Sequence, residues 1–281
     1  MEQEKSLIEI IQSYLNSDNV KLPVFSSTAL RIQNEISKEE PDARLIEKLI
    51  ISDQALTSSV LKHSNSSFYK GFTEVSTVKQ AMVRLGINEV SNIVIMISQE
   101  NNFRSKDPFV QNIMSKLWRH SVGCAIGASW LSKNCSLVGL TNEVFVAALL
   151  HDVGKLLILK VIDELKHAGE LNGGISDEVL NEAMNTLHTD LGYTLMRKWN
   201  LPETYSRVVR DHHLEEIDSN NLPLIIVRLS DKGCNKLGIG VNSDPSIVLA
   251  AMPEAEMMNL SEIDIAKLEI KLEDSKLLNY S

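Results

Sequence analysis

Residues 144–155 read VFVAALLHDVGK, an unbroken apolar run that leads directly into a histidine and an aspartate. Seven apolar residues in succession belong in a protein interior, so His151 and Asp152 lie at the edge of a core. Burying a carboxylate without a partner is costly, and a nearby cation offsets that cost. This stretch therefore predicts a buried element and a titratable pair that needs a partner from elsewhere in the chain.

Apolar residues in the rest of the chain recur with the period of an α-helix. Between Val78 and Leu85 they fall at i, i+3, i+4 and i+7, and Gly86 then interrupts the pattern. Residues 89–100 form a nearly continuous apolar stretch, which favours a buried helix. Two longer stripes consist of Ile113, Leu117, Cys124, Ala128 and Leu131, and of Leu180, Met184, Leu187, Leu191 and Leu195. No stretch alternates in the manner of a strand, so the sequence predicts an all-α fold.

Capping residues mark where several of these helices begin. Asp42 follows a proline that breaks the preceding pattern, and Ser176 precedes two acidic residues. Ser261 and Asp264 have the spacing of a capping box. We expect a helix to begin directly after each of these three N-cap residues.

The distribution of histidine divides the chain. Only one of the seven histidines precedes the polar segment 101–108. At 281 residues, the chain also exceeds the usual size of a single core. We predict an amino-terminal helical lobe over residues 1–105, a chemically distinct helical lobe over 106–240 and a carboxy-terminal helical tail over 241–281.

Composition excludes several classes of protein. Hydrophobic residues make up 43% and charged residues 23%, no apolar run reaches the ~18 residues of a membrane span, and the first residues do not resemble a signal peptide. We therefore expect a cytoplasmic protein with no membrane partner. The net charge of −9 opposes binding to nucleic acid. Three scattered cysteines predict reduced, packed side chains rather than disulfides or a thiolate zinc site.

Five histidines and two aspartates stand among apolar or acidic neighbours. One histidine on an apolar face is more commonly a hydrogen-bonded core residue than a metal ligand. Two buried carboxylates among five imidazoles need compensation, however, and a divalent cation supplies it. Imidazole nitrogen and carboxylate oxygen together suit iron, manganese, zinc or similar ions. The candidate residues are His120, His151, Asp152, His188, His212, His213 and Asp231.

Part of this set resembles a known signature. The segments WRHS at residues 118–121 and HDVGK at residues 151–155, followed by Asp231, resemble the H…HD…D signature of HD-superfamily phosphohydrolases. The adjacent His-Asp pair with Gly154 and Lys155 is the specific part of this match. The resemblance implies that the second lobe has the helical fold of the HD superfamily.

The remaining histidines resemble the pattern of HD-GYP phosphodiesterases, which hold two metals. That resemblance implies one ion on His120, His151 and Asp231, and another on His188, His212 and His213. Asp152 would bridge the two ions, and Lys155 would lie near a substrate phosphate. Asp152 and Lys155 are therefore the candidate catalytic residues, and the implied cofactor is two divalent ions, iron, manganese or similar.

The chain departs from the HD-GYP pattern in two places. Residues 214–221 read LEEIDSNN where those enzymes carry Gly-Tyr-Pro. Lys116 occupies the position, four residues before His120, at which some of those enzymes place an additional acidic ligand. Neither a third metal nor specificity for cyclic dinucleotides follows from the resemblance.

The amino-terminal half resembles the HDOD family. The match rests on LPVF at residues 22–25, ISDQAL at residues 51–56, SNS at residues 64–66 and the helical pattern over 78–86. It covers roughly residues 20 to 215, and Asn65 is expected to make structural hydrogen bonds. Many HDOD proteins have lost the metal ligands and are regarded as regulatory modules, whereas this chain has kept them.

The resemblance implies a regulatory protein of bacterial signal transduction with a signalling protein as partner. The alternative is a metal-dependent phosphohydrolase or phosphodiesterase acting on a nucleotide or another phosphorylated small molecule. A redox-sensing iron pair has no dedicated support in the sequence. Retained ligands indicate metal binding rather than turnover, so the sequence leaves open whether the protein is an enzyme.

Overall fold

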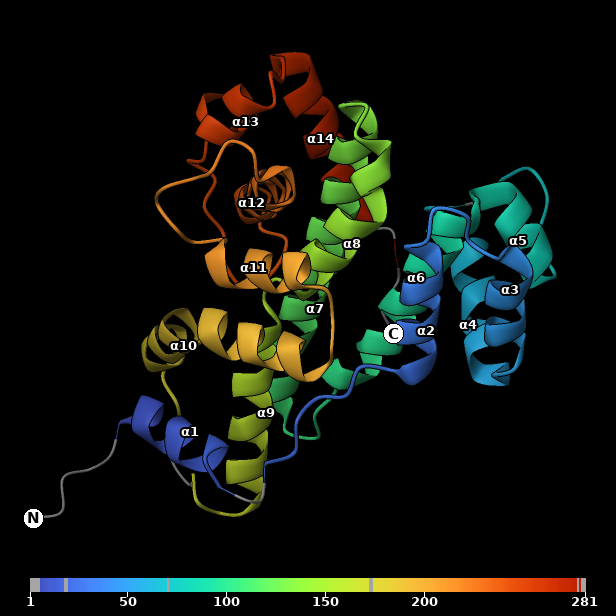
Figure 1. Cartoon of the computed structure of the whole chain (residues 1–281). Coiled ribbons are helices and arrows are strands. Elements are labelled where there is room, and N and C mark those ends of the chain that lie inside the picture. Colours follow the sequence, from blue (N-terminus) through green and yellow to red (C-terminus); the bar gives the residue numbers. More distant parts are fainter. Residues whose placement is uncertain (1–5, 18–19, 70, 172–173, 277, 279–281) are drawn as a thin grey trace, which may run out of the picture.

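A computed structural model of the chain describes residues 6–17, 20–69, 71–171, 174–276 and 278. Within these ranges the regular structure consists of α-helices and short 3-10 turns, with no strand, which confirms the prediction of an all-α fold. Figure 1 shows a compact group of helices, α2 to α6, beside a larger body built around α7, α8 and α9.

The smaller group has its own hydrophobic core. Buried aliphatic side chains between Ile32 and Val94 form this core, and α6 separates it from the larger body. The same helix contributes Ile95 and Met96 to the core of the larger body. The helices of this group are α2 (Ser27–Ile36), α3 (Ala43–Ile51), α4 (Gln54–Ser64), α5 (Val78–Leu85) and α6 (Ile87–Glu100).

The larger body surrounds α7, a helix of 27 residues that packs against α8, α12 and α14. Its helices are α1 (Leu7–Leu15), α7 (Pro108–Asn134), α8 (Thr141–Leu150), α9 (Val153–His167), α10 (Asp177–Lys198), α11 (Glu203–Asp211), α12 (Leu222–Lys236), α13 (Pro253–Met257) and α14 (Glu262–Ser275). The 3-10 turns are η1 (Asn101–Phe103), η2 (Val138–Leu140) and η3 (Leu249–Ala251).

The predicted N-caps occupy their expected places. The carboxylate of Asp42 accepts hydrogen bonds from two backbone N–H groups at the start of α3, and Ser176 accepts one at the start of α10. Ser261 and Asp264 form a reciprocal capping box at the start of α14. Each cap satisfies N–H groups that the first helical turn leaves without partners.

Gly86 separates α5 from α6, as the sequence pattern predicts. Its φ of 88° lies in the left-handed region, which glycine adopts without strain. Helix α6 then continues with an unbroken buried stretch from Val90 to Met96. Among the described residues no single helix is long and apolar enough to cross a membrane. Helices α5 and α6 meet that criterion only as a pair, and the pair is bent by 119°.

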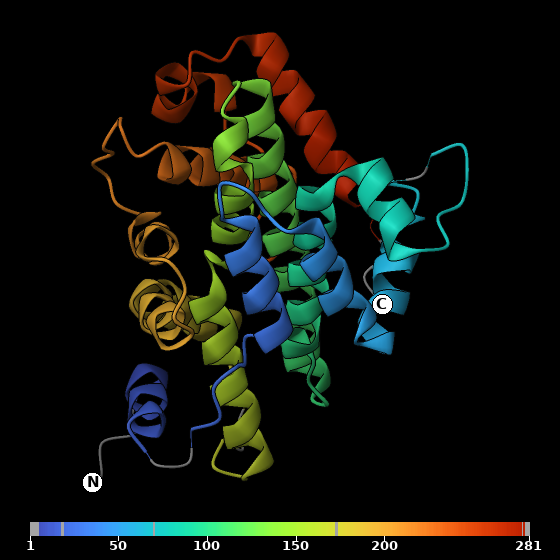
Figure 2. The ribbon, with the colours of Figure 1, turned by 45° about the vertical axis from the view of Figure 1, so that its right-hand side comes forward.

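The two ends of the described chain pack onto the larger body. Helix α1 contacts α9 and α10 of the larger body, although it belongs to the amino-terminal lobe that the sequence predicts over residues 1–105. Helix α14 runs along α7, as Figure 2 shows, and its Leu268 and Leu272 enter the same core as α7 and α12. The predicted lobe boundaries at residues 105 and 240 remain a prediction. Helices α1 and α14 lie outside these boundaries, and both pack against helices of the segment 106–240.

Asn65 makes the structural hydrogen bonds expected of it. Its side-chain amide donates to the carbonyl of Val75 over 2.8 Å and accepts from the N–H of Val75 over 2.9 Å. We expect Asn65→Ala to lower the free energy of unfolding by about 1–3 kcal/mol, because both backbone groups lose a partner. Urea denaturation measures this change. Asn16→Ala, at the exposed end of α1, is the control, and equal effects of both substitutions would contradict the assignment.

Candidate metal centre

The structure brings all seven predicted ligands together where α7 to α12 converge (Figure 1). They come from α7 (His120), the α8–α9 junction (His151 and Asp152), α10 (His188), the end of α11 (His212 and His213) and α12 (Asp231). Three overlapping sets have ligand atoms within 4.8 Å of one another: His120, Cys124, His151 and Asp231; His188, His212 and His213; and His151, Asp152 and His212.

Gly154 allows α9 and α10 to cross closely enough to join these residues. A Cβ atom at this position would lie 1.9 Å from the backbone oxygen of His188 and 2.8 Å from the backbone nitrogen of Gly192. No side chain fits between two helices at that separation. The glycine of the HDVGK segment therefore places His188 beside Asp152.

The first group of donors consists of His120, His151 and Asp231 and lies on one side of Asp152. The Nε2 atom of His120 is 3.2 Å from Oδ1 of Asp231 and 3.3 Å from Nε2 of His151. The Oδ2 atom of Asp152 is 3.6 Å from Nε2 of His120 and 3.5 Å from Nε2 of His151. These four side chains are buried.

The second group of donors consists of His188, His212 and His213 and faces the other carboxylate oxygen of Asp152. The Oδ1 atom of Asp152 lies 3.6 Å from Nε2 of His188 and 3.6 Å from Nε2 of His212. His213 packs beside both rings and is more exposed than they are. One oxygen of Asp152 thus faces each group, which is the arrangement that a bridging carboxylate requires.

Backbone carbonyls orient the four buried imidazoles. The Nδ1 atoms bond to the carbonyl oxygens of four residues: Ile239 for His120, Ala148 for His151, Met184 for His188 and Val209 for His212. A carbonyl only accepts, so each Nδ1 carries a hydrogen, and Nε2 of the neutral ring presents its lone pair to the centre. Metal-bound histidines in proteins are commonly held in this way.

The buried charges of the site balance one another. Burial lowers the pKa of His120, but the hydrogen bond to Asp231 and the nearby negative charges together outweigh burial and raise that pKa to about 9. Burial also raises the pKa of Asp152 and lowers that of Lys155. The attraction between these two groups, 2.8 Å apart, reverses both shifts, with the neighbouring histidines contributing at Asp152. Both carboxylates therefore have counter-ions within the protein, and their burial does not by itself require a metal.

The second group supplies a stronger indication of metal binding. The Nε2 atoms of His188 and His212 are 3.3 Å apart, and both rings use their Nδ1 hydrogen elsewhere. Burial lowers the pKa of His188 to about 4, so this ring is neutral at pH 7. The Oδ1 atom of Asp152 has no hydrogen-bond partner within the described part of the chain. Three potential metal-ligand atoms thus converge at one buried point.

A divalent ion fits this donor set. Bonds of about 2.0–2.2 Å to nitrogen and oxygen place neighbouring donors of one ion about 3 to 4 Å apart. The separations in both groups are within that range. Burial also lowers the pKa of His151 to about 4, which keeps this ring in the neutral form that binds metals. The residues present therefore fit a divalent metal centre around Asp152.

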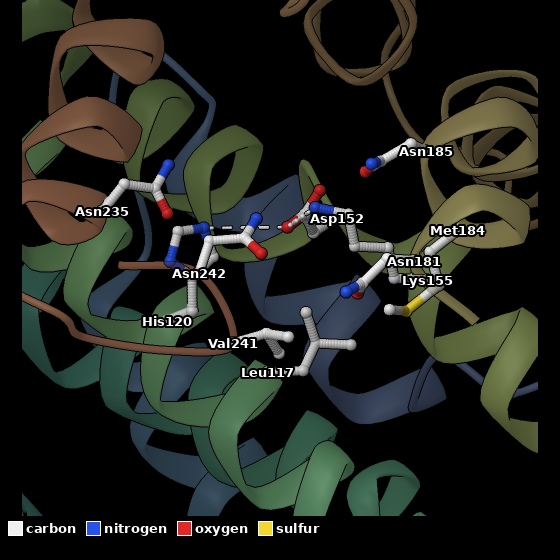
Figure 3. A pocket seen from close by; sticks show the side chains of 10 residues that line it. All are labelled: Leu117, His120, Asp152, Lys155, Asn181, Met184, Asn185, Asn235, Val241 and Asn242. Atoms are coloured by element: carbon white, nitrogen blue, oxygen red, sulfur yellow. Dashed lines mark hydrogen bonds and ion pairs between the residues drawn. The ribbon is translucent and has the colours of Figure 1, made fainter. Parts of the chain in front are cut away.

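The predicted catalytic lysine lies at the wall of a small cavity. In Figure 3, Asp152 stands between His120 and Lys155, and asparagine side chains lie around these three residues. Asn181 and Asn185 come from α10, whereas Asn242 belongs to the segment that follows α12. The cavity volume is about 10 Å³, which is room for one water molecule.

The structure reveals site residues that the sequence patterns did not identify. Cys124 belongs to the first group of donors, and Asn235 donates to Oδ1 of Asp231 over 2.9 Å. Each lies one helical turn after a predicted ligand, a spacing that could have revealed them. Gly240, with φ of 134°, places its backbone against the ring of His120. No local pattern indicates that contact, because it joins segments about 120 residues apart.

Comparison with known proteins identifies the family. The sequence profile of the HDOD domain matches residues 22–215, more than half of the chain. The chain belongs to the HDOD family. Its HDOD match ends before Asp231, so the last predicted ligand lies outside the matched region.

Two solved structures resemble this HDOD chain over nearly its whole length. An HDOD domain protein of unknown function from Geobacter sulfurreducens has a TM-score of 0.76 and 21% identity, over 96% of this chain and 98% of the other. A Shewanella amazonensis protein, named as a proposed metal-dependent phosphohydrolase, has a TM-score of 0.70 and 18% identity, over 98% of each chain. At these identities the similarity establishes the shared fold.

One curated relative is an uncharacterized protein of Treponema pallidum. It is 27% identical to this HDOD chain over 200 residues, which is 68% of this chain. The aligned region is only 37% of the length of that relative.

Proposed function

We propose that this HDOD chain is a cytoplasmic regulatory protein of bacterial signal transduction whose HD-like lobe binds two divalent ions, iron, manganese or similar. The observation that carries this proposal is that three buried potential ligand atoms, His188 Nε2, His212 Nε2 and Asp152 Oδ1, lie within 3.6 Å of one another. The HD-GYP-like order of ligands along the chain supports the same proposal.

The ligands divide between two ions. His120, His151 and Asp231 would hold the first ion, and His188, His212 and His213 the second, with one oxygen of Asp152 toward each. Bound divalent ions supply positive charge that polarises phosphoryl oxygens and lowers the pKa of water. The cavity beside Asp152 has no room for a substrate in this structure, so we favour a regulatory role over catalytic turnover.

Helix α11 connects the metal centre to the smaller group of helices. Gln33 of α2 donates a buried hydrogen bond of 2.6 Å to the hydroxyl of Tyr205 in α11. Tyr205 and His212 are seven residues apart, which is two helical turns on one face. Trp199, just before α11, donates to the carbonyl of Pro23 over 3.0 Å. A change in metal occupancy at His212 would thus reach the smaller group through α11, where a signalling protein could detect it.

Elemental analysis of protein purified without added metal or a chelating column tests the proposal. We expect about two ions per chain and a large fall in melting temperature after chelation. At a free metal concentration of about 100 times Kd, each site stabilises the fold by about 2.7 kcal/mol. Absence of metal, even after anaerobic reconstitution with iron or manganese, would refute metal-dependent regulation.

His188→Ala separates the two sites. The substitution removes one donor from the second group and leaves the first group intact, so metal content should fall from two ions toward one. Metal analysis of the purified variant measures the change. His167→Ala, at the end of α9 and outside both groups, is the matched control. A wild-type content of one ion would favour a mononuclear centre.

A metal-dependent phosphohydrolase is the second candidate function. Lys155 lines the cavity beside Asp152, where its ammonium group could contact a substrate phosphate if the covering segment opened. The name of the similar Shewanella protein supports this candidate. The substrate would be a nucleotide or another phosphorylated small molecule.

Lys155→Met tests the lysine in that reaction. The variant keeps the apolar stem but lacks the cation, so hydrolysis of phosphate esters should fall at least about 100-fold while metal content is retained. A panel of phosphorylated nucleotides measures turnover. Lys160→Met, on the same helix and bonded to the carbonyl of Arg104, is the control. Equal loss of metal and activity would remove the proposed substrate role of Lys155.

A further inference from the structure

Cys124 lies inside the first group of donors. Its Sγ atom is 3.6 Å from Nε2 of His120 and within 4.8 Å of the ligand atoms of His151 and Asp231. The side chain is fully buried. Two imidazoles and one carboxylate, all predicted metal ligands, therefore surround the sulfur atom.

The helices fix this placement. Cys124 follows His120 by four residues on α7, and Cys234 follows Asp231 by three residues on α12. Positions three or four residues apart share one helix face. Cys124 and Cys234 therefore both point to the seam between α7 and α12, where burial and then the hydrogen bond between the two thiols raise the pKa of Cys124. Cys124 is thus a protonated thiol without metal, and once a metal ion displaces that proton the Cys234 thiol can donate to the sulfur of Cys124.

We propose that Cys124 is a thiolate ligand of the first metal ion and that Cys234 supports it by donating a hydrogen bond to its sulfur. The inference rests on the proposed metal-binding function and adds a ligand to it. The first site then consists of His120, Cys124, His151 and Asp231, together with the bridging Asp152. The thiol proton of Cys124 leaves when the metal–sulfur bond forms.

A sulfur ligand changes which metals the first site prefers. Thiolates favour zinc, iron and cobalt over magnesium and manganese, whereas the second site offers imidazole and carboxylate alone. The two ions would therefore differ in affinity and in identity. The structure confirms that the cysteines are unpaired and that Cys124 and Cys234 are buried, and the proposal adds a ligand role to one of them.

Cobalt substitution gives a direct test on the full-length protein. Thiolate bound to cobalt(II) produces an intense near-ultraviolet charge-transfer band, which imidazole and carboxylate ligands do not produce. We expect wild-type protein to show this band and Cys124→Ser to lose it, with at least about tenfold weaker binding of one ion. Cys135→Ser, at the end of α7 and outside the donor group, should keep the band. Cys234→Ser should keep the band at a shifted energy.

X-ray absorption of the zinc-loaded wild-type protein provides a measurement that needs no variant. One sulfur neighbour at about 2.3 Å from part of the zinc supports the inference. Two bound cobalt ions without a charge-transfer band, or a band that survives in Cys124→Ser, would overturn it while leaving the proposed function intact. Protein that binds no cobalt at all would overturn both.

Discussion

Asp152→Asn should abolish binding of both metal ions, because each carboxylate oxygen faces one group of donors. The amide keeps the volume of the side chain but loses the negative charge and one of its two acceptors. Substitutions outside the ligand shell already weaken metal binding about 10–100-fold. Loss of a ligand shared by both sites should therefore lower the metal affinity of each site at least about 100-fold. Metal analysis and calorimetric titration measure the loss.

The buried lysine requires a control for this variant. Lys155 would lose its counter-ion, and an unpaired buried charge can destabilise a protein by about 3–5 kcal/mol. The double variant Asp152→Asn with Lys155→Met removes both charges and should fold without binding metal. Asp190→Asn removes one exposed charge on α10 outside both donor groups, and this variant should bind metal normally. Two ions on the folded double variant would show that Asp152 does not bridge.

Gly154→Ala should destabilise the fold and weaken the second metal site. The added Cβ would meet the backbone oxygen of His188 at 1.9 Å, and backbone cannot yield as a flexible side chain can. We expect a loss of about 3 kcal/mol, the upper part of the usual cost of overpacking. Helices α9 and α10 would separate, which moves His188 away from Asp152. Urea denaturation and metal analysis measure the two effects.

Gly139→Ala is the matched control for that substitution. Nothing lies within 4 Å of a Cβ atom built at Gly139, and its φ is not in the left-handed region. Its free energy of unfolding should change by no more than about 0.5 kcal/mol. Similar effects at the two glycines would contradict the steric explanation for Gly154.

The burial of most of the proposed ligands could be predicted from sequence because these residues interrupt apolar stripes. His120 and His188 stand on buried helix faces, and Asp231 ends an apolar run, so their burial follows from periodicity. Their grouping around Asp152 came from the family resemblance. The protonation states of these residues could not be predicted. They depend on the ion pairs of Lys155 with Asp152 and of His120 with Asp231, which form only in the folded structure.

The helices and their caps were predictable, whereas the packing of the flanking helices was not. Periodicity and capping are local properties, and the starts of α3, α10 and α14 followed from Asp42, Ser176 and Ser261. The docking of α1 onto α9 and α10 depends on surfaces that form only when distant segments meet. The closeness of Cys124 to His151 and Asp231 depends in the same way on segments that are distant in sequence.

The segment 237–248 after α12 would limit how fast an ion enters or leaves the first group of donors. The carbonyl of Ile239 holds His120, Gly240 lies against its ring, and the space beside Asp152 is about 10 Å³. A hydrated ion is larger than that space, so exchange at the first group would wait for local opening of the backbone. Exchange there would be slow regardless of affinity, whereas His213 of the second group is exposed. The first site would keep the ion acquired while the chain folded, and its occupancy would reflect past rather than current metal supply.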